Sequence, residues 1–398
     1  MRNKSCDIFC NVIDNYGDIG VCWRLARQLA HEQGIAVRLW VDDLSSFHRL
    51  CFEVDAAQEQ QVCLGVEVRH WTDFFPRVEP AHLIIEAFAC QLPTSYIEAM
   101  AAQTRQPVWI NLEHLSAEDW VAGCHGLPSP HPSLLLTKYF FFPGFTPDTG
   151  GLLLEDDLMA RREAFQLDPL QQQAFWQFVG VEMPSARTLK ISLFCYENSA
   201  IEAMLSAWSQ SITPVLCLMP EGRALPQVAE FFGLSQVLPG KTYIKGWLQL
   251  RVLPFMEQQR YDELLWACDI NFVRGEDSFV RAQWAGKPFV WHIYPQQDSA
   301  HIEKLRAFLK LHCAGQLHCA GLPPDVAQAM QNFWVGWNAG NSSEQSALLG
   351  LAQVWNDFLT HESVLRQHAQ SWAQQLSANR LVLNVLNFYR KIDRMHNL

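Results

Sequence analysis

Near-continuous apolar runs alternate with helix-periodic segments along the first part of the chain. The apolar runs occupy residues 6–12, 36–41, 66–71, 82–88 and 107–113, and the clearest helical patterns between them occupy 18–33 and 95–104. Strands that are apolar throughout and separated by helices are typical of a parallel sheet covered on both faces. A passage rich in proline and glycine follows at 125–151, and we interpret it as loops near a domain boundary.

The same alternation restarts in the second half of the chain. Strands are predicted at 188–196, 214–220, 248–255, 269–273 and 287–293, with helices at 199–209, 224–232, 258–267 and 298–312. Residues 363–392 have the periodicity of one long amphipathic helix. The sequence therefore predicts an α/β protein with two Rossmann-like domains that face a cleft, spanning residues 1–180 and 181–365, and a C-terminal helix at 366–398 that returns to the first domain.

Composition narrows the class of protein. Hydrophobic residues make up 49% of the chain and charged residues 18%, which is typical of a globular protein. The formal net charge of −11 argues against nucleic acid as a partner. No apolar stretch reaches the roughly 20 residues that a membrane helix needs, and no signal peptide is recognisable. We expect a cytoplasmic protein whose 12 cysteines are reduced thiols.

Two patterns could suggest a metal ion. One is the segment LHCAGQLHC, which contains His312, Cys313, His318 and Cys319. Its cysteines are six residues apart, whereas structural zinc sites favour pairs two to four apart. The other is a pair of acidic doublets, Asp42–Asp43 and Asp156–Asp157, which we interpret as a helix start and as part of a solvated acidic run. We expect no metal.

An acidic turn follows the first predicted strand. It contains Asp14, Asn15, Tyr16, Gly17 and Asp18. In open α/β sheets, ligands bind beyond the carboxyl ends of the strands, so this turn is a candidate site. Each aspartate alone is explained by a helix cap or an Asx turn. As a pair, the carboxylates can hold a cationic or hydroxyl acceptor and accept its proton.

A second turn follows the predicted strand at 269–273. It contains Arg274, Gly275, Glu276, Asp277 and Ser278. Gly275 permits close backbone approach, and Ser278 adds a hydroxyl beside the free N–H groups of a helix start, which suits a phosphate. Glu276 and Asp277 suit sugar hydroxyls or serve as caps, and Arg274 is either a phosphate counter-charge or part of an ordinary ion pair.

Aromatic side chains end three strands of the second half. They are Phe194 and Tyr196, Phe255, and Tyr294, which Gln297 follows closely. Such residues are usually core, but several at one sheet edge can stack on a nucleobase. No GxGxxG, GxxxxGK[ST], HExxH or GxSxG pattern is present, which disfavours dehydrogenases, P-loop proteins, zinc proteases and α/β-hydrolases. A nucleotide-sugar enzyme is the interpretation that these features favour.

Three long motifs resemble a known family. They are DNYGDIGVCWRLARQL, SLFCYEN and RGEDSFVRAQWAGKPFVWHIYPQQDSAH. On these motifs, over essentially its full length, the chain resembles the bacterial protein-arginine rhamnosyltransferases that modify elongation factor P. The resemblance implies an inverting, metal-independent GT-B glycosyltransferase that needs no cofactor and uses dTDP-β-L-rhamnose. It also implies that the modification activates the factor to rescue ribosomes stalled at polyproline.

The resemblance also implies roles for individual residues. Asp18 would be the catalytic aspartate, with Asp14 and Asn15 beside the acceptor and Tyr16 and Gly17 in the same turn. The donor would be bound by the remaining candidates: Phe194 and Phe255 at the thymine, Tyr196 nearby, Glu276 at the sugar and ribose, Asp277 and Ser278 at the diphosphate, and Tyr294 and Gln297 along the pocket. Arg274 either serves the diphosphate or braces the loop, and Glu276 acts either in chemistry or in donor binding alone.

Two other functions remain open from the sequence. One is a different GT-B enzyme, such as a nucleotide-sugar epimerase or a transferase acting on a small molecule or lipid. The other is a non-catalytic protein that binds nucleotides or translation factors.

Overall fold

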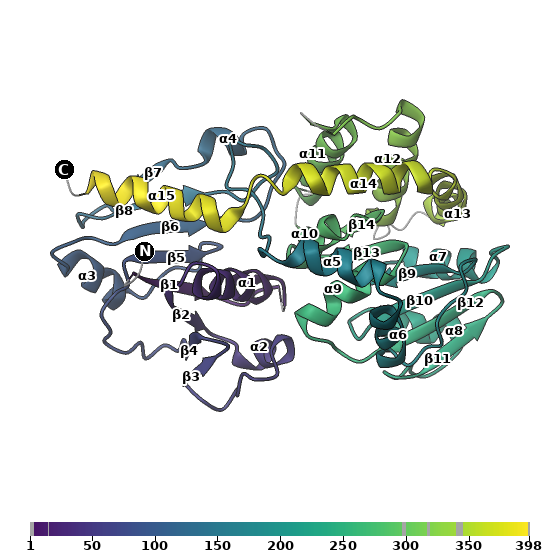
Figure 1. Ribbon diagram of the computed structural model, residues 1–398, viewed down its shortest axis with the longest axis horizontal. Helices are drawn as coiled ribbons and strands as arrows, with labels where there is room; N and C mark the ends of the chain where they lie inside the picture. The colour runs from purple at the N-terminus through teal and green to yellow at the C-terminus, as the bar shows by residue number, and fades with distance from the viewer. Residues whose placement is uncertain (1–3, 15, 297–299, 317–318, 340–344, 397–398) are drawn as a thin grey trace. The chain divides into compact units, whose positions relative to one another are not determined.

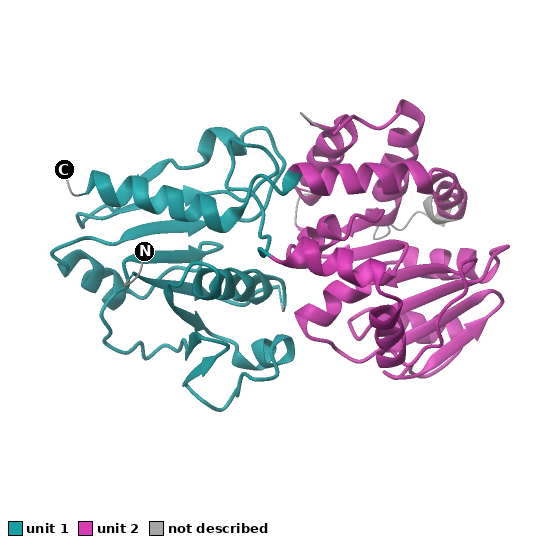
Figure 2. Ribbon diagram, in the orientation of Figure 1, with its two compact units in different colours: residues 1–156, 376–398 teal, residues 157–375 magenta. Residues whose placement is uncertain are grey.

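The chain divides into two compact units. The computed structural model describes residues 4–14, 16–296, 300–316, 319–339 and 345–396. The first unit comprises residues 1–156 and 376–398, and the second comprises 157–375 (Figure 2). These boundaries differ from those expected at 180 and 365. The first unit is therefore built from two separate stretches of the chain.

The first unit is organised around one eight-stranded sheet. Its strands are β1 (Ser5–Cys10), β2 (Ala36–Val41), β3 (Gln60–Cys63), β4 (Val66–His70), β5 (Leu83–Ala87), β6 (Val108–Leu112), β7 (Pro128–Pro130) and β8 (Thr137–Phe141). Their spatial order is β3-β4-β2-β1-β5-β6-β8-β7. The inner strands from β4 to β8 are parallel, and the two edge strands are antiparallel to their neighbours.

Helices accompany this sheet. They are α1 (Gly17–His31), α2 (Leu44–Leu50), α3 (Thr94–Ala102), α4 (Val121–Cys124) and α15 (Leu381–Met395). The last helix comes from the far end of the chain and packs on α1 and β6, so both chain ends lie in this unit (Figure 1). It buries a stripe formed by Leu381, Val382, Val385, Leu386, Tyr389 and Ile392, which is the apolar face of an amphipathic helix.

The second unit has a six-stranded sheet. Its strands are β9 (Leu189–Leu193), β10 (Val215–Pro220), β11 (Thr242–Lys245), β12 (Leu248–Leu253), β13 (Ile270–Arg274) and β14 (Phe289–His292), in the spatial order β11-β12-β10-β9-β13-β14. Only the pair of β11 with β12 is antiparallel among the described strands of this sheet. The helices are α5 (Leu158–Leu167), α6 (Pro169–Phe178), α7 (Ala200–Ser209), α8 (Leu225–Phe232), α9 (Gln258–Ala267), α10 (Asp277–Ala285), α11 (Ala300–Ala314), α12 (Pro324–Asn338), α13 (Gln345–Thr360) and α14 (Glu362–Leu376).

Each sheet has a point at which the strand order reverses. In the first unit the chain builds outward from β1 toward β2 and β4, and then restarts at β5 on the other side of β1. In the second unit the same reversal lies between β9 and β13. Ligands of open α/β sheets bind outside the carboxyl ends of the strands at such a switch point. The fold therefore indicates one site at β1/β5 and one at β9/β13.

Two sequence expectations are corrected. The passage at 125–151, expected to be loops, contains β7 and β8. Its prolines are tolerated because β7 is an edge strand, where a missing N–H costs no ladder bond. The helix expected over 363–392 is two helices, α14 and α15, separated at 377–380.

The break between α14 and α15 has a tertiary cause. The backbone N–H of Leu152 donates to the carbonyl of Asn379 at 3.1 Å, and the N–H of Leu381 donates to the carbonyl of Leu152 at 2.8 Å. These bonds replace those that a continuous helix would make. Gly151 has φ +77°, and a Cβ there would lie 2.3 Å from the Asn379 carbonyl oxygen. The close approach therefore depends on glycine at position 151. The local sequence pattern does not reveal this effect, because Asn379 lies far away along the chain.

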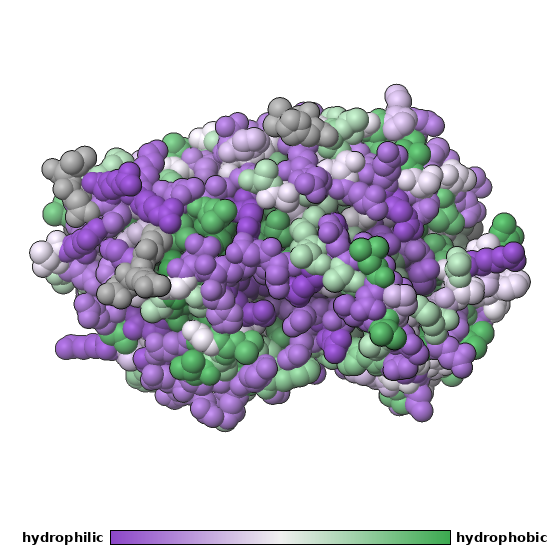
Figure 3. Space-filling model, in the orientation of Figure 1, coloured by the Kyte–Doolittle hydropathy of each residue, from purple (hydrophilic) through white to green (hydrophobic). Residues whose placement is uncertain are grey.

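The visible surface is largely hydrophilic, with apolar residues in small scattered groups (Figure 3). Among the described helices, none combines the length and the apolar character needed to cross a bilayer.

Candidate active site

Asp18 lies in the first turn of α1 and is 7% exposed. Its Oδ2 accepts hydrogen bonds from the backbone N–H groups of Ile13 and Asp14, both at 2.9 Å. These donors belong to the loop before α1, so the carboxylate holds that loop in place. An ordinary helix cap would instead accept from N–H groups inside the first turn of the helix. Two backbone donors fix the orientation of the carboxylate at the carboxyl end of β1.

The turn before Asp18 brings the second aspartate close to the backbone. The N–H of Gly17 donates to the carbonyl of Asp14 at 2.7 Å, and a Cβ on Gly17 would lie 2.9 Å from Asp14 Oδ2. Glycine is therefore the residue that leaves room for this carboxylate. Tyr16 Oη accepts a hydrogen bond from Arg49 Nη1 at 3.0 Å. Asn15 lies outside the described residues.

A third carboxylate braces the same strand end. Asp42 Oδ2 accepts from Asn11 Nδ2 at 2.7 Å, and its Oδ1 accepts from the N–H of Val12 at 2.8 Å. In the Asp42–Asp43 doublet, Asp43 is the residue that caps a helix, because its carboxylate accepts from the N–H groups of Ser45 and Ser46. Sequence reasoning missed the role of Asp42, although an acid directly after a strand that neighbours β1 was a usable signal.

The field at this edge is negative. The pKa of the buried Cys10 thiol is raised well above its ordinary value, first by its hydrogen bond with Cys22 and by burial, and then by the carboxylates of Asp18 and Asp42. A cation would be attracted to this edge for the same electrostatic reason.

In the second unit, Arg274 ends β13 and is 6% exposed. Its guanidinium carbon lies 4.6 Å from the ring centroids of both Phe194 and Tyr196. Among the residues that the structure describes, no carboxylate pairs with Arg274, and its buried Nη1 has no hydrogen-bond partner. A buried cation is costly without an anion, and aromatic faces offset only part of that cost. This arrangement is suited to an anionic ligand.

The turn after Arg274 leads into α10. Gly275 has φ +63°, the left-handed region that favours glycine, and its carbonyl accepts from Trp291 Nε1 at 2.8 Å. Ser278 Oγ accepts from the Arg274 N–H at 3.1 Å and donates to the Arg274 carbonyl. Glu276 occupies the N-cap position without a side-chain capping bond, and Asp277 Oδ2 accepts from Gln258 Nε2 at 3.4 Å.

The predicted aromatic residues fall into two groups. Tyr196 packs edge-on against Tyr294, with ring centroids 5.4 Å apart, and both lie near the β9/β13 switch point. Tyr294 is 43% exposed. Phe255 is half-buried after β12, which β10 separates from β9. Gln297 lies outside the described residues.

His292 is a further polar residue at this site, and sequence reasoning did not single it out. It is the β14 partner of Arg274 in the strand register, and its ring lies 5.3 Å from that of Tyr196. Burial, with the nearby charge of Arg274, lowers the pKa of His292 to about 3. The imidazole is therefore neutral at physiological pH and adds no second cation beside Arg274.

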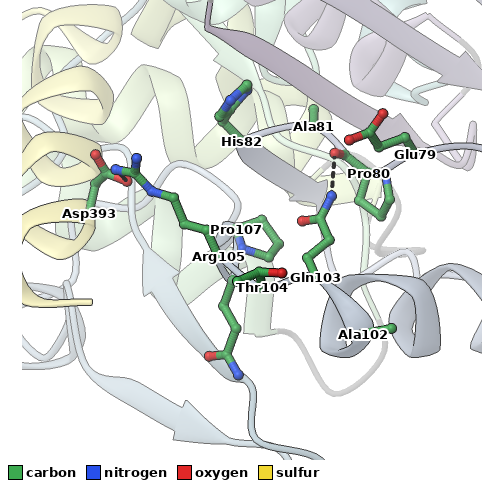
Figure 4. A pocket seen from close by; sticks show the side chains of 11 residues that line it. Glu79, Pro80, Ala81, His82, Ala102, Gln103, Thr104, Arg105, Pro107 and Asp393 are labelled. Atoms are coloured by element: carbon green, nitrogen blue, oxygen red, sulfur yellow. Dashed lines mark hydrogen bonds and ion pairs between the residues drawn. The ribbon is translucent and has the colours of Figure 1, made fainter. Parts of the chain in front are cut away.

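One surface cavity of the first unit lies away from both candidate sites. It has a volume of about 440 Å³ and is lined by residues that precede β5 and β6, including His82, Gln103 and Arg105 (Figure 4). Gln103 Nε2 donates to the Pro80 carbonyl at 3.0 Å, and Arg105 pairs with Asp393 of α15. This is the amino-terminal edge of the parallel strands, and none of the predicted site residues lines it.

The LHCAGQLHC segment is partly described. His312 is buried against Trp372, with ring centroids 4.8 Å apart, and Cys319 Sγ lies 3.7 Å from His368 Nδ1. His318 lies outside the described residues. Over the described part of the chain, no three His, Cys, Asp or Glu side chains gather in a group that could hold a metal ion.

Comparisons with known sequences give one family. The model of the family described as "Elongation-Factor P (EF-P) rhamnosyltransferase EarP" matches residues 6–390. A protein-arginine rhamnosyltransferase of Pseudomonas putida is 49% identical over 386 residues, which cover 96% of this chain and 98% of the relative. One of Shewanella oneidensis is 41% identical over 398 residues and covers 97% of each chain.

Comparisons with solved structures agree. The structure reported as "Structural basis for EarP-mediated arginine glycosylation of translation elongation factor EF-P" is 35% identical, with a TM-score of 0.68, and covers 98% of this chain and 99% of that one. A glycosyltransferase of Rickettsia africae has a TM-score of 0.52 at 10% identity over 99% of each chain, a likeness of fold alone. The expected GT-B class with two Rossmann-like domains is confirmed.

Proposed function

The chain belongs to the EarP family of elongation-factor P rhamnosyltransferases and is a protein-arginine rhamnosyltransferase, and from this premise we propose that it transfers L-rhamnose from dTDP-β-L-rhamnose to an arginine of elongation factor P with inversion. The reaction takes place in the cytoplasm, and the modified factor acts on ribosomes stalled at polyproline. No metal ion or cofactor takes part.

The observation that carries the donor assignment is the buried Arg274. A guanidinium that lacks a carboxylate partner among the described residues, and whose Nη1 is unsatisfied, supports a site for a diphosphate. The N-terminus of α10 begins three residues later, where N–H groups and Ser278 can stabilise the negative charge of the leaving dTDP. Asp277 contributes to the same turn.

The aromatic residues bind the other parts of the donor. Phe194 and Phe255 hold the thymine, because stacking of a base on an aromatic ring is worth about 1–3 kcal/mol. Tyr196 and Tyr294 line the pocket together with Gln297, and Glu276 contacts the sugar and ribose. Because His292 is neutral, the positive charge that faces the diphosphate comes from Arg274.

The acidic turn of the first unit serves the acceptor. A guanidinium has a pKa above about 12 and a delocalised lone pair, so it is a poor nucleophile at neutral pH. Asp14 and Asn15 hold the acceptor arginine, while Asp18 accepts a proton as the guanidinium nitrogen forms a bond to the anomeric carbon. The bond from that carbon to the diphosphate oxygen breaks on the opposite face, which inverts the configuration. Tyr16 and Gly17 shape the turn, and Glu276 assists orientation from the donor side.

The test is a transfer assay read by intact mass. Wild-type protein, dTDP-β-L-rhamnose and elongation factor P are incubated together, and we expect the factor to gain one deoxyhexose. A factor in which the acceptor arginine is replaced by lysine should gain none. No mass gain on the factor, with the donor sugar epimerised or unchanged, would instead support an epimerase or a non-catalytic binder.

A further inference from the structure

The switch point of the first unit has two sides, and the proposed function uses only one. Asp14 and Asp18 follow β1, whereas the segment Phe88–Gln91 follows β5 on the other side of the reversal. Three residues of this segment, Phe88, Ala89 and Gln91, have φ values of +56°, +54° and +53°. None is glycine, so the backbone is strained at each position. Strain of this kind persists where side chains or backbone groups are needed in one fixed arrangement.

The neighbouring strand ends hold this strained segment in place. The N–H of Phe88 donates to the Leu112 carbonyl at 2.7 Å, and the N–H of Ala89 donates to Asn111 Oδ1 at 3.0 Å. Asn111 is 1% exposed, and its Nδ2 donates to Glu113. One buried amide thus links the loop after β5 to the carboxylate after β6.

The held segment and the residues that follow β6 together present an aromatic pair and an acid. The ring of the half-buried Phe88 stacks on that of His114, with centroids 4.5 Å apart and planes at 15°. Glu113 lies between Asn111 and His114 in sequence, and burial raises its pKa, which the charges of His114 and Lys138 partly oppose. A partly desolvated carboxylate gains from a cation placed beside it. We call Phe88, Glu113 and His114 the acceptor platform.

The platform lies within reach of the acidic turn. β1, β5 and β6 are adjacent parallel strands, so their carboxyl ends lie at one edge of the sheet, with β1 and β6 about 10 Å apart at the usual strand spacing. Cys90 Sγ contacts the Phe9 carbonyl at 3.4 Å, which ties the strained segment to β1 itself. An aromatic face beside carboxylates recognises a planar cation and repels a diphosphate.

We propose that the acceptor platform binds the guanidinium of the acceptor arginine by stacking and charge, and directs it to the Asp14–Asp18 turn. This inference rests on the proposed function and names a second acceptor-binding element for the same site. Phe88 and Glu113 are positioning and binding residues, whereas proton transfer stays with Asp18. The strain fixes the Phe88 ring at the switch point, so the acceptor meets a preformed surface.

The test separates acceptor binding from donor binding. Initial rates are measured for Phe88→Leu and Glu113→Gln with elongation factor P varied at saturating dTDP-β-L-rhamnose, and then with the donor varied. We expect KM for the factor to rise about 3- to 30-fold, as loss of a cation–π or charge contact predicts, while KM for the donor changes less than about twofold. Phe88→Tyr keeps the planar ring and should restore the wild-type KM. Glu113→Gln retains an oxygen for the Asn111 bond and removes only the charge.

Matched controls lie away from this edge. Leu135→Ala removes an exposed side chain before β8, at the opposite edge of the sheet, and Glu98→Gln removes an exposed charge on α3. Neither should change KM for the factor. If wild-type protein transfers rhamnose but Phe88→Leu and Glu113→Gln keep the wild-type KM for the factor, or raise both KM values equally, the platform is overturned. If wild-type protein transfers nothing to the factor, the proposed function itself fails and the platform falls with it.

Discussion

At the scale of single residues, the two units separate the proposed chemistry from nucleotide binding. Asp18→Asn keeps an oxygen that can accept from the N–H groups of Ile13 and Asp14, so the turn should keep its shape while the proton acceptor is lost. Transfer should therefore fall by at least about 100-fold, with dTDP affinity unchanged by calorimetry. Phe255→Ala should weaken dTDP binding by about 1–3 kcal/mol. An equal loss of dTDP affinity in both variants would contradict this division.

Ala89→Gly tests the strain at the first switch point. Relieving a left-handed alanine gains about 1–2 kcal/mol, and the added flexibility of the unfolded chain costs about 0.4–1 kcal/mol. The free energy of unfolding of the first unit should therefore rise by about 0.5–1 kcal/mol in denaturant titrations. Ala99→Gly, within α3, should lower it by a similar amount. A loss of stability in both variants would show that the positive φ of Ala89 costs nothing.

At the scale of elements, hydrophobic pattern predicted the parallel core and the spacing between strands and helices. Each of the ten strands expected from the sequence is present, and most of its residues are buried or half-buried, although β4 carries polar residues. Four strands were not expected: β3, β7 and β11 are edge strands with exposed or proline-bearing positions, and β8 lies inside the sheet, in the passage rich in proline and glycine. The order of the strands in a sheet cannot be read from the local pattern, because it depends on where each connection places the next strand.

Asp14, Asp18 and the turn after Arg274 could be proposed from the sequence, because each directly follows a predicted strand. Phe88 could not be proposed, because no glycine or asparagine marks its left-handed backbone.

Gly151→Ala tests the contact that divides α14 from α15. A Cβ there meets the Asn379 carbonyl at 2.3 Å and is strained at φ +77°, so we expect the first unit to lose about 2–4 kcal/mol. Gly34→Ala shares a positive φ of +64° but meets nothing within 4 Å, and it should cost only about 1 kcal/mol. The two variants are compared by denaturant titration. Equal losses would mean that the approach of residues 151 and 379 is not tight.

At the scale of the whole molecule, buried neutral histidines set the response to acid. Burial lowers the pKa of His292, His312 and His368. The unfolded chain therefore binds more protons than the folded chain below about pH 6.5, and the free energy of unfolding rises with pH up to about 6.5, by up to about 1.4 kcal/mol per pH unit for each group. Glu32 and Glu113, whose pKa values burial raises, act in the opposite sense.

We therefore expect Tm to fall between pH 7 and pH 5. His312→Gln, which replaces a histidine packed against His368 and Trp372, should reduce that fall even if it lowers Tm at pH 7. A fall of unchanged size in His312→Gln would assign the acid response to other groups.

The C-terminal helix α15 belongs to the first unit, although it comes from the far end of the chain. Six buried side chains of α15, at about 1.5–3 kcal/mol each, contribute about 9–18 kcal/mol, which is comparable with the whole stability of a domain. Removing residues 377–398 should unfold the first unit, seen as loss of one thermal transition and as rapid proteolysis of residues 1–156. The shortened chain should still bind dTDP, because the residues proposed to bind the donor all lie in 157–375.

The split composition of the first unit also fixes the order in which the nascent protein matures. Its sheet is translated first, yet the surface that α15 covers on α1 and β6 stays open while the ribosome makes all of residues 157–375. The second unit is complete in sequence before the first unit receives its last helix, so the part of the enzyme synthesised earliest is the last to close.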